Sequence, residues 1–86
     1  MYINIGAATV LRTENIVGIF DMDNTTVSAR TRRYLNTAEK EGKIINVAED
    51  IPKSFVVVNE DGENIIYLSQ LSTSTLLKRT NYINYL

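Results

Sequence analysis

Short hydrophobic segments separated by polar turns open the chain and predict three β-strands within its first quarter. Apolar and polar side chains alternate over residues 2–6, and residues 9–12 form a second segment of strand length. The continuous apolar run at residues 16–20 is typical of a buried strand. Turns are expected at Gly6-Ala7-Ala8 and at the polar residues 13–15.

The hydrophobic period then changes to that of a helix, which is expected over Thr26–Glu41. The apolar face of this helix has members three and four residues apart: Val27, Thr31, Tyr34, Leu35 and Ala38. The preceding segment is rich in capping side chains, and Asp23, Asn24 or Thr25 is expected to cap the first turn. Gly42 can adopt the left-handed conformation that commonly ends a helix.

The second half of the chain predicts a β-hairpin. A short strand is expected over residues 43–47, and an acidic loop follows at residues 48–52. Residues 54–58 and 64–68 are rich in β-branched and aromatic side chains, and the residues between them include an Asp-Gly pair. This combination is typical of two antiparallel strands joined by a turn.

Together these elements predict an α+β fold in a single domain over residues 1–86. It has a small antiparallel β-sheet, one main amphipathic helix, and a short C-terminal helix that follows the capping hydroxyls of residues 72–75. Much of the core is expected to come from eight side chains: Ile3, Ile5, Val10, Val17, Ile19, Leu35, Val56 and Ile66. A chain this short buries a modest core and leaves sheet edges open, so self-association is expected.

Composition limits the chemistry, because the chain has no cysteine and no histidine. Disulfides and thiolate metal sites are excluded, and the commonest general base and metal ligand are missing. The chain also has no apolar run of about 18 residues that could span a membrane, and no basic segment before an apolar one that would indicate a signal peptide. A cytoplasmic location without membrane contact is therefore expected.

One stretch looks like the nucleophile motif of a phosphatase. Residues 19–27 read IFDMDNTTV, and phosphatases of the haloacid dehalogenase type end a strand in D-x-D-x-T, so Asp21 would attack phosphorus and Asp23 would act as the acid/base with magnesium. That chemistry needs further groups on parallel strands, each reached by a crossover of about a dozen residues or more. The best later candidates, Lys53 and Glu60-Asp61, lie on or beside the predicted hairpin. No catalysis, cofactor, metal or small-molecule substrate is therefore expected.

Basic side chains offer a different function. The predicted main helix carries four of them outside its apolar face: Arg30, Arg32, Arg33 and Lys40. They could meet phosphates or only solvent, and Lys78 and Arg79 could join them if the two helices lie close together. One copy with so few contacts would bind DNA weakly and with a steep salt dependence, whereas an oligomer repeats the patch along a duplex.

Four stretches, in the same order, resemble one protein family. They read YINIG at residues 2–6, IVGIFD at 16–21, PKSFVV at 52–57 and LSTSTLLKR at 71–79. Over nearly its whole length the chain resembles extracellular matrix regulatory proteins of the RemB or YaaB type of Firmicutes, which are relatives of the DNA-binding biofilm regulator RemA. The resemblance implies a fold like that of LytTR-type DNA-binding domains, and assembly into a ring. It also implies regulation of matrix genes by arginines that bind DNA around that ring.

The chain departs from this family at the arginines themselves. In RemA-type proteins they lie in the loop before the third strand and in the loop before the strand that follows the helix. The matching positions here are about Asn15 and Ile51-Pro52, and the nearest basic residues are Arg12 and Lys53. DNA contacts therefore cannot be transferred from the family one by one.

Two main hypotheses follow for the function, and a magnesium-dependent phosphatase that uses Asp21 is a distant third. The first is a transcriptional regulator of extracellular matrix and biofilm genes that binds double-stranded DNA as a homo-oligomer, which could be a ring. Its candidate contacts are Arg12, Arg30, Arg32, Arg33, Lys40, Lys53, Lys78 and Arg79. The second is a protein-interaction or scaffold module without DNA contact, which the missing loop arginines and the apolar residues 82–86 favour.

Overall fold

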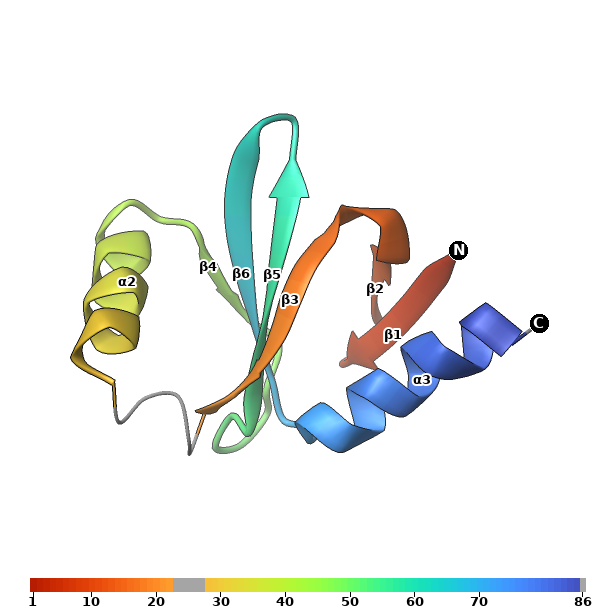
Figure 1. Ribbon diagram of the computed structural model, residues 1–86. Coiled ribbons are helices and arrows are strands. Elements are labelled where there is room, and N and C mark those ends of the chain that lie inside the picture. The colour runs from red at the N-terminus through yellow and green to blue at the C-terminus, as the bar shows by residue number, and fades with distance from the viewer. Residues whose placement is uncertain (23–27, 86) are drawn as a thin grey trace.

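Two β-sheets and two α-helices form the described part of the protein in the computed structural model (Figure 1). The structure describes residues 1–22 and 28–85, with side chains as far as residue 80. The predicted α+β class is confirmed. Within these residues, neither helix is both long and apolar enough to cross a bilayer.

The N-terminal hairpin makes a sheet of its own. Strands β1 (Tyr2–Gly6) and β2 (Thr9–Arg12) pair antiparallel, and the 3-10 helix η1 (Thr13–Asn15) leads from β2 into the next strand. The turn between β1 and β2 has positive φ angles at Gly6, Ala7 and Ala8. The two predicted strands and the first predicted turn are thus present, and a 3-10 helix stands where the second turn was predicted.

The second sheet has the strand order β3–β5–β6–β4. Strands β3 (Ile16–Asp21), β5 (Ser54–Glu60) and β6 (Glu63–Ser69) are antiparallel neighbours, but β4 (Ile44–Asn46) pairs parallel to β6. The prediction of a purely antiparallel sheet was therefore wrong at this edge. The reason is that the segment between β3 and β4 crosses over and returns the chain to the end where β3 began, as parallel strands require.

The central hairpin between β5 and β6 has a tighter turn than the sequence suggested. Glu60 pairs with Glu63, so only Asp61 and Gly62 form the loop, with φ angles of 53° and 85°. Two successive positive φ values are the mark of a type I′ turn, whose twist matches that of the strands. The side-chain amide of Asn59 donates to Oδ1 of Asn64 at 3.1 Å and closes the strands beside the turn.

Both helices begin at serine caps. Helix α2 (Ala29–Lys40) has Ser28 as its N-cap, and α3 (Thr73–Tyr85) begins after Ser72, whose Oγ accepts from the Thr75 amide at 3.2 Å. The predicted caps at residues 23–25 and the predicted start at Thr26 lie outside the described residues. Gly42 has a φ of 71°, which confirms the left-handed stop. With 13 residues against 12, the C-terminal helix is not the shorter one.

The two helices cover opposite faces of the four-stranded sheet (Figure 1). Helix α2 lies on one face, where Ala38 packs with Phe55, Val57 and Ile66. The β1–β2 hairpin and α3 lie on the other face, in a cluster made of Ile3, Ile5, Leu11, Val56, Val58 and Leu76. Successive residues of β5 thus serve two separate clusters, because side chains alternate across a strand.

Most of the predicted core is confirmed, but two of the residues predicted to be buried are exposed. Ile3, Ile5, Val56 and Ile66 are buried, and Ile19 and Leu35 are partly buried against the two clusters. Val10 and Val17, in contrast, are exposed. The predicted core also omitted five side chains that are buried: Leu11, Phe55, Val57, Val58 and Leu76. Val10 is exposed because its neighbour Leu11, which pairs with Ile3, is the residue of β2 that faces the core.

The prediction that Val17 is buried was wrong because β3 contains a β-bulge. The register shifts between Ile16 and Gly18, so Ile16 pairs with Val58 and Ile19 pairs with Val56. Ile16 and Ile19 consequently both face the cluster beneath α3, although a regular strand would place them on opposite faces. The extra residue, Val17, is left 64% exposed on the side of α2.

Candidate nucleic-acid interface

Helix α2 presents its basic side chains to solvent because its inner positions are taken by small and apolar residues. Thr31, Leu35 and Ala38 are partly or fully buried and recur at helical spacing. On the other side, Arg33 and Lys40 lie two turns apart on the same outward stripe, which follows from their seven-residue separation. All four basic residues of this helix are exposed: Arg30, Arg32, Arg33 and Lys40.

The charge of α2 is unbalanced along its length. Its first turn contains no acidic residue, while the first half of the helix holds Arg30, Arg32 and Arg33. Glu39 and Glu41 come only at the end. The partial positive charge at a helix N-terminus adds to that of the arginines, so this end of α2 is the natural place for an anion.

The basic residues of α3 do not join this face. The two helices are separated by the sheet, so the condition under which Lys78 and Arg79 would extend the α2 patch is not met (Figure 1). Lys78 is exposed, and the Arg79 guanidinium donates to the backbone oxygen of Asn4 at 2.5 Å. Lys53 is exposed at the start of β5, where its backbone bonds Met22 and Ser69.

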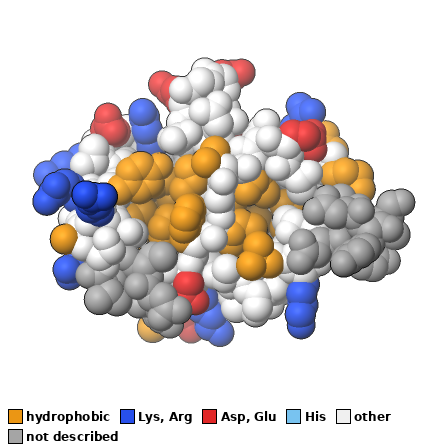
Figure 2. Space-filling model, viewed as in Figure 1, with side chains coloured by type: hydrophobic (Ala, Val, Ile, Leu, Met, Phe, Trp, Pro, Cys, Tyr) orange, Lys and Arg blue, Asp and Glu red, His pale blue; other side chains and the backbone are white. Residues whose placement is uncertain are grey.

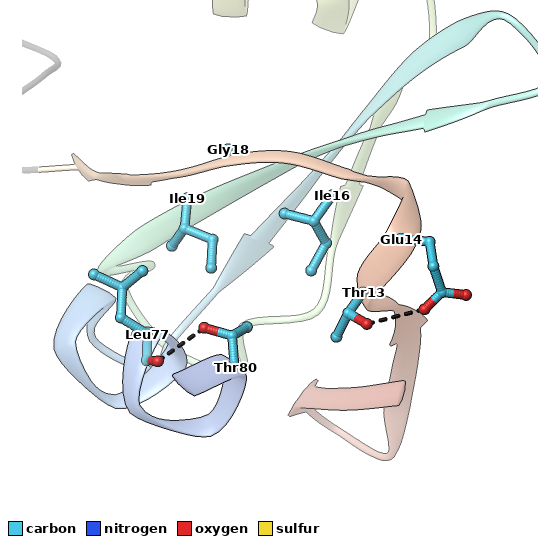
Figure 3. Close-up of a pocket in the computed structure, with 7 residues that line it drawn as sticks. All are labelled: Thr13, Glu14, Ile16, Gly18, Ile19, Leu77 and Thr80. Carbon is cyan, nitrogen blue, oxygen red and sulfur yellow. Dashed lines mark hydrogen bonds between the residues drawn. The ribbon is translucent and has the colours of Figure 1, made fainter. Parts of the chain in front are cut away.

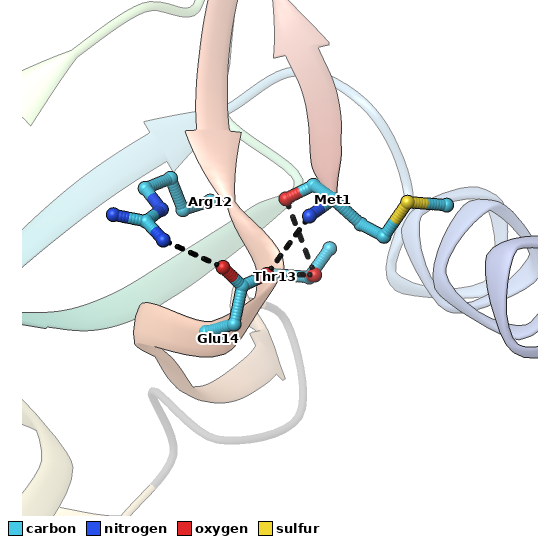
Figure 4. Close-up of polar contacts among 4 residues, drawn as sticks. All are labelled: Met1, Arg12, Thr13 and Glu14. Carbon is cyan, nitrogen blue, oxygen red and sulfur yellow. Dashed lines mark hydrogen bonds and ion pairs between the residues drawn. The ribbon is translucent and has the colours of Figure 1, made fainter.

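Arg12 is held by a neighbouring carboxylate. Figure 4 shows Glu14 between the Arg12 guanidinium and the amino group of Met1, each 3.0 Å from a carboxylate oxygen. The hydroxyl of Thr13 also donates to Glu14. The amino group, this hydroxyl and Arg12 all favour the ionised form and lower the pKa of Glu14 to about 2. Arg12 therefore offers an anion less net charge than the α2 arginines do.

We expect Glu14 to make stability depend on pH in the acid range. Its pKa is depressed from 4.5 to about 2 by folding, so its contribution is complete above pH 4.5 and is lost as the pH falls towards 2. Replacing Glu14 with Gln should therefore lower the urea midpoint at pH 6 and leave it nearly unchanged at pH 2. Equal losses at both pH values would show that the ion pairs with Met1 and Arg12 are not the cause.

A hydrophobic groove runs between α2 and the β3–β5 half of the sheet. It has a volume of about 350 Å³, and Figure 2 shows hydrophobic side chains gathered in the hollow between the helix and the strands. The ring of Phe20 stacks on Phe55 at 5.0 Å between centroids. The lining residues are Val17, Phe20, Arg30, Thr31, Tyr34, Phe55, Val57 and Asn64. Sequence reasoning missed this groove, because it assigned Val17 and Tyr34 to buried faces.

A second hollow, of about 380 Å³, lies on the opposite side of β3, against α3 (Figure 3). Ile16 and Ile19 point into it from the strand, and Leu77 and Thr80 border it from the helix. The Thr80 hydroxyl is already used, because it donates to the backbone oxygen of Leu77 at 2.8 Å. Glu14 at its rim is held by the ion pairs described above, so the hollow offers few free groups for a ligand.

The arrangement of the strands around Asp21 does not support the phosphatase hypothesis. Asp21 ends β3, an edge strand that pairs antiparallel with β5, whereas that chemistry uses the ends of adjacent parallel strands. Lys53 does lie beside this strand end, but Glu60-Asp61 lies at the far end of the hairpin. Asp23 is outside the described residues. Within them, no group of three or more acidic residues could hold a metal.

Comparison with known proteins places the chain in a family. A model of the RemA-like family, described as extracellular matrix regulatory protein A-like, matches residues 2–80. The chain belongs to the RemA-like family. It is also 36% identical over 83 residues to extracellular matrix regulatory protein B of Bacillus subtilis (strain 168), which covers 96% of this chain and 94% of that protein. The resemblance inferred from four sequence stretches is thereby confirmed.

The RemA-like match runs through all the elements described above. It extends from β1 into α3, so both sheets, the groove and the α2 face lie inside the family region. The resemblance implies arginines at about Asn15 and Ile51-Pro52, and in this chain Asn15 and Pro52 are half-buried while Ile51 is exposed.

Proposed function

We propose that this RemA-like protein is a cytoplasmic transcriptional regulator of extracellular matrix genes that binds double-stranded DNA as a homo-oligomer. The observation that carries the proposal is the outward basic stripe of α2, made by Arg32, Arg33 and Lys40. Membership of a family of extracellular matrix regulatory proteins supports it.

Charge explains why several copies are needed. The chain has a net charge of −1, so the molecule as a whole does not attract a polyanion, and in this proposal the attraction comes from the local field of α2. That field is screened beyond about 10 Å at 0.1 M salt. Three phosphate contacts from one copy give weak binding, whereas an oligomer brings the same three contacts to the duplex again and again.

DNA retention by the wild type should fall steeply with salt, and removal of the α2 stripe should flatten that dependence. The slope of log K against log salt is about −0.9 per phosphate contact. The triple variant Arg32→Gln, Arg33→Gln, Lys40→Gln should therefore have a slope that is less negative by about 2 to 3 for each copy bound. Fluorescence anisotropy of a labelled duplex between 25 and about 200 mM salt measures this.

Lys78→Gln is the matched control, because it removes an exposed charge from the other side of the sheet. Its slope should stay close to that of the wild type. Two results would contradict the proposal: no binding of the wild type even at low salt, or the same slope for the triple variant and the wild type.

A protein-interaction module without DNA contact is the second candidate. It is favoured by the exposed hydrophobic groove beside α2 and by the absence of arginine at about Ile51-Pro52, where the resemblance implies one. The two candidates differ in one experiment: this module would self-associate or bind a partner while showing no DNA binding at low salt.

A further inference from the structure

Two exposed hydrophobic features in the described chain have no partner within it. One is the groove beside α2, and the other is Ile51 in the loop between β4 and β5. Ile51 is 78% exposed, the highest value among the large hydrophobic residues that are exposed. It does not line the groove, so the loop of a molecule does not occupy the groove of that same molecule.

The groove is hydrophobic at its floor and basic at its rim. Phe20 and Phe55 stack at the floor, and Val17 and Tyr34 remain 64% and 42% exposed at the sides. Arg30, in the first turn of α2, is exposed and is one of the residues that line the groove. Among its described lining residues none is acidic. An occupant that fits would combine a hydrophobic side chain with a nearby carboxylate.

The β4–β5 loop has that combination. Ile51 follows Glu49 and Asp50 directly, and both carboxylates are exposed. Neither is in an ion pair among those found in the described residues, which join only Met1 and Arg12 to Glu14.

The loop is also held in place on both sides of Ile51. The Glu49 amide donates to Oε1 of Gln70 at 3.0 Å, and the Lys53 amide donates to the Ser69 backbone oxygen at 2.9 Å. Pro52 restricts the backbone between them. A side chain presented on a fixed loop loses little conformational freedom on docking, which favours association.

We propose that the β4–β5 loop of one copy docks in the α2 groove of a second copy, with Ile51 between Val17 and Tyr34 and Asp50 facing Arg30. The observations that carry this are the matched charge of the two surfaces and their hydrophobic centres. The proposal deepens the self-association that is part of the proposed function.

Because the groove and the loop are different surfaces, the contact is heterologous. Each copy inserts its loop into one neighbour and accepts the loop of another in its groove. Arg33 and Lys40 do not line the groove, so the outward stripe of α2 stays available for DNA.

Complementary single variants test this directly. Ile51→Glu damages only the loop, and Val17→Glu damages only the groove, so each alone should dissociate at least tenfold more readily than the wild type. A 1:1 mixture of the two should form a heterodimer, since the intact groove of one variant accepts the intact loop of the other. Light scattering coupled to size exclusion, with native mass spectrometry of the mixture, measures both effects.

Val10→Glu is the matched control, because Val10 is an exposed valine that lies in neither surface. It should leave the mass unchanged. Circular dichroism checks the fold of each variant, and a charge exchange supplies an independent measurement: Arg30→Glu and Asp50→Arg should each weaken association, and the double variant should recover it.

The outcomes separate this proposal from the wider one. Monomeric wild type, association unaffected by Ile51→Glu, or a mixture that fails to pair would each overturn it, and loss with Val17→Glu alone would show that something other than this loop enters the groove. DNA binding is scored separately, by the salt slope of Ile51→Glu and wild type. If the protein associates through these surfaces but does not bind DNA, only the proposed function is contradicted.

Discussion

Replacing Leu76 with alanine should remove much of the stability of the protein and could unfold it near physiological temperature. Leu76 has no exposed surface and is the buried residue of α3 among its described side chains. It fills the cluster that joins Ile3 and Ile5 of the N-terminal hairpin to Val56 of the sheet. A buried Leu→Ala substitution costs about 2 to 5 kcal/mol. At about 0.05 to 0.15 kcal/mol per residue, a domain of this size has roughly 4 to 13 kcal/mol in total.

Leu77→Ala is the matched control, since it removes the same atoms from the next position of the same helix, where the side chain is 44% exposed. Urea unfolding followed by circular dichroism should show a small shift for Leu77→Ala and a large one, or no folded baseline, for Leu76→Ala. Equal shifts would mean that α3 does not pack on the sheet through Leu76.

Ser69→Ala should have the second largest effect, because this hydroxyl connects three parts of the fold. Ser69 is fully buried at the end of β6. Its Oγ donates to the backbone oxygen of Ile5 at 2.7 Å and accepts from the Leu71 amide at 3.0 Å. Alanine leaves both backbone groups without this partner, and a buried group left unpaired costs about 1 to 3 kcal/mol. Unfolding free energy from urea titration should fall by about that amount.

Two other serines help to interpret that result. Ser54 is equally buried, but its hydroxyl makes one hydrogen bond, to the Leu71 backbone oxygen at 2.8 Å, so Ser54→Ala should cost less. Ser74 is exposed, and Ser74→Ala should be nearly neutral. A Ser69→Ala variant as stable as Ser74→Ala would indicate that water replaces the hydroxyl and that the site is not closed.

Local signals in the sequence were enough to predict most of the elements. The Asp61-Gly62 pair and Gly42 adopt the positive φ angles that their residue types suggest, and the strands beside the turn follow from their β-branched content. These features are encoded within a few residues of where they occur. That is why the hairpin, the end of α2 and the α+β class could be read without knowing the fold.

Features that depend on distant partners could not be read in this way. The bulge at Val17 shows only in the register of β3 against β5, and it decides which of the apolar residues 16–20 are buried. The direction of β4 depends on the crossover that precedes it. For the candidate site, the sequence identified the basic side chains but not their separation by the sheet, which divides α2 from Lys78 and Arg79.

The joining of the first strand to the last helix has a consequence for the protein during its synthesis. Arg79 bonds Asn4 across 75 positions of the chain, and Leu76 completes the cluster that covers Ile3 and Ile5. Among the described elements, the ribosome makes β1 first and α3 last. The hydrophobic face of the N-terminal hairpin therefore stays uncovered until α3 has been made. Contacts between such distant residues also form slowly. This side of the sheet can therefore be completed only after α3 has been synthesised, and until then its uncovered hydrophobic face favours aggregation.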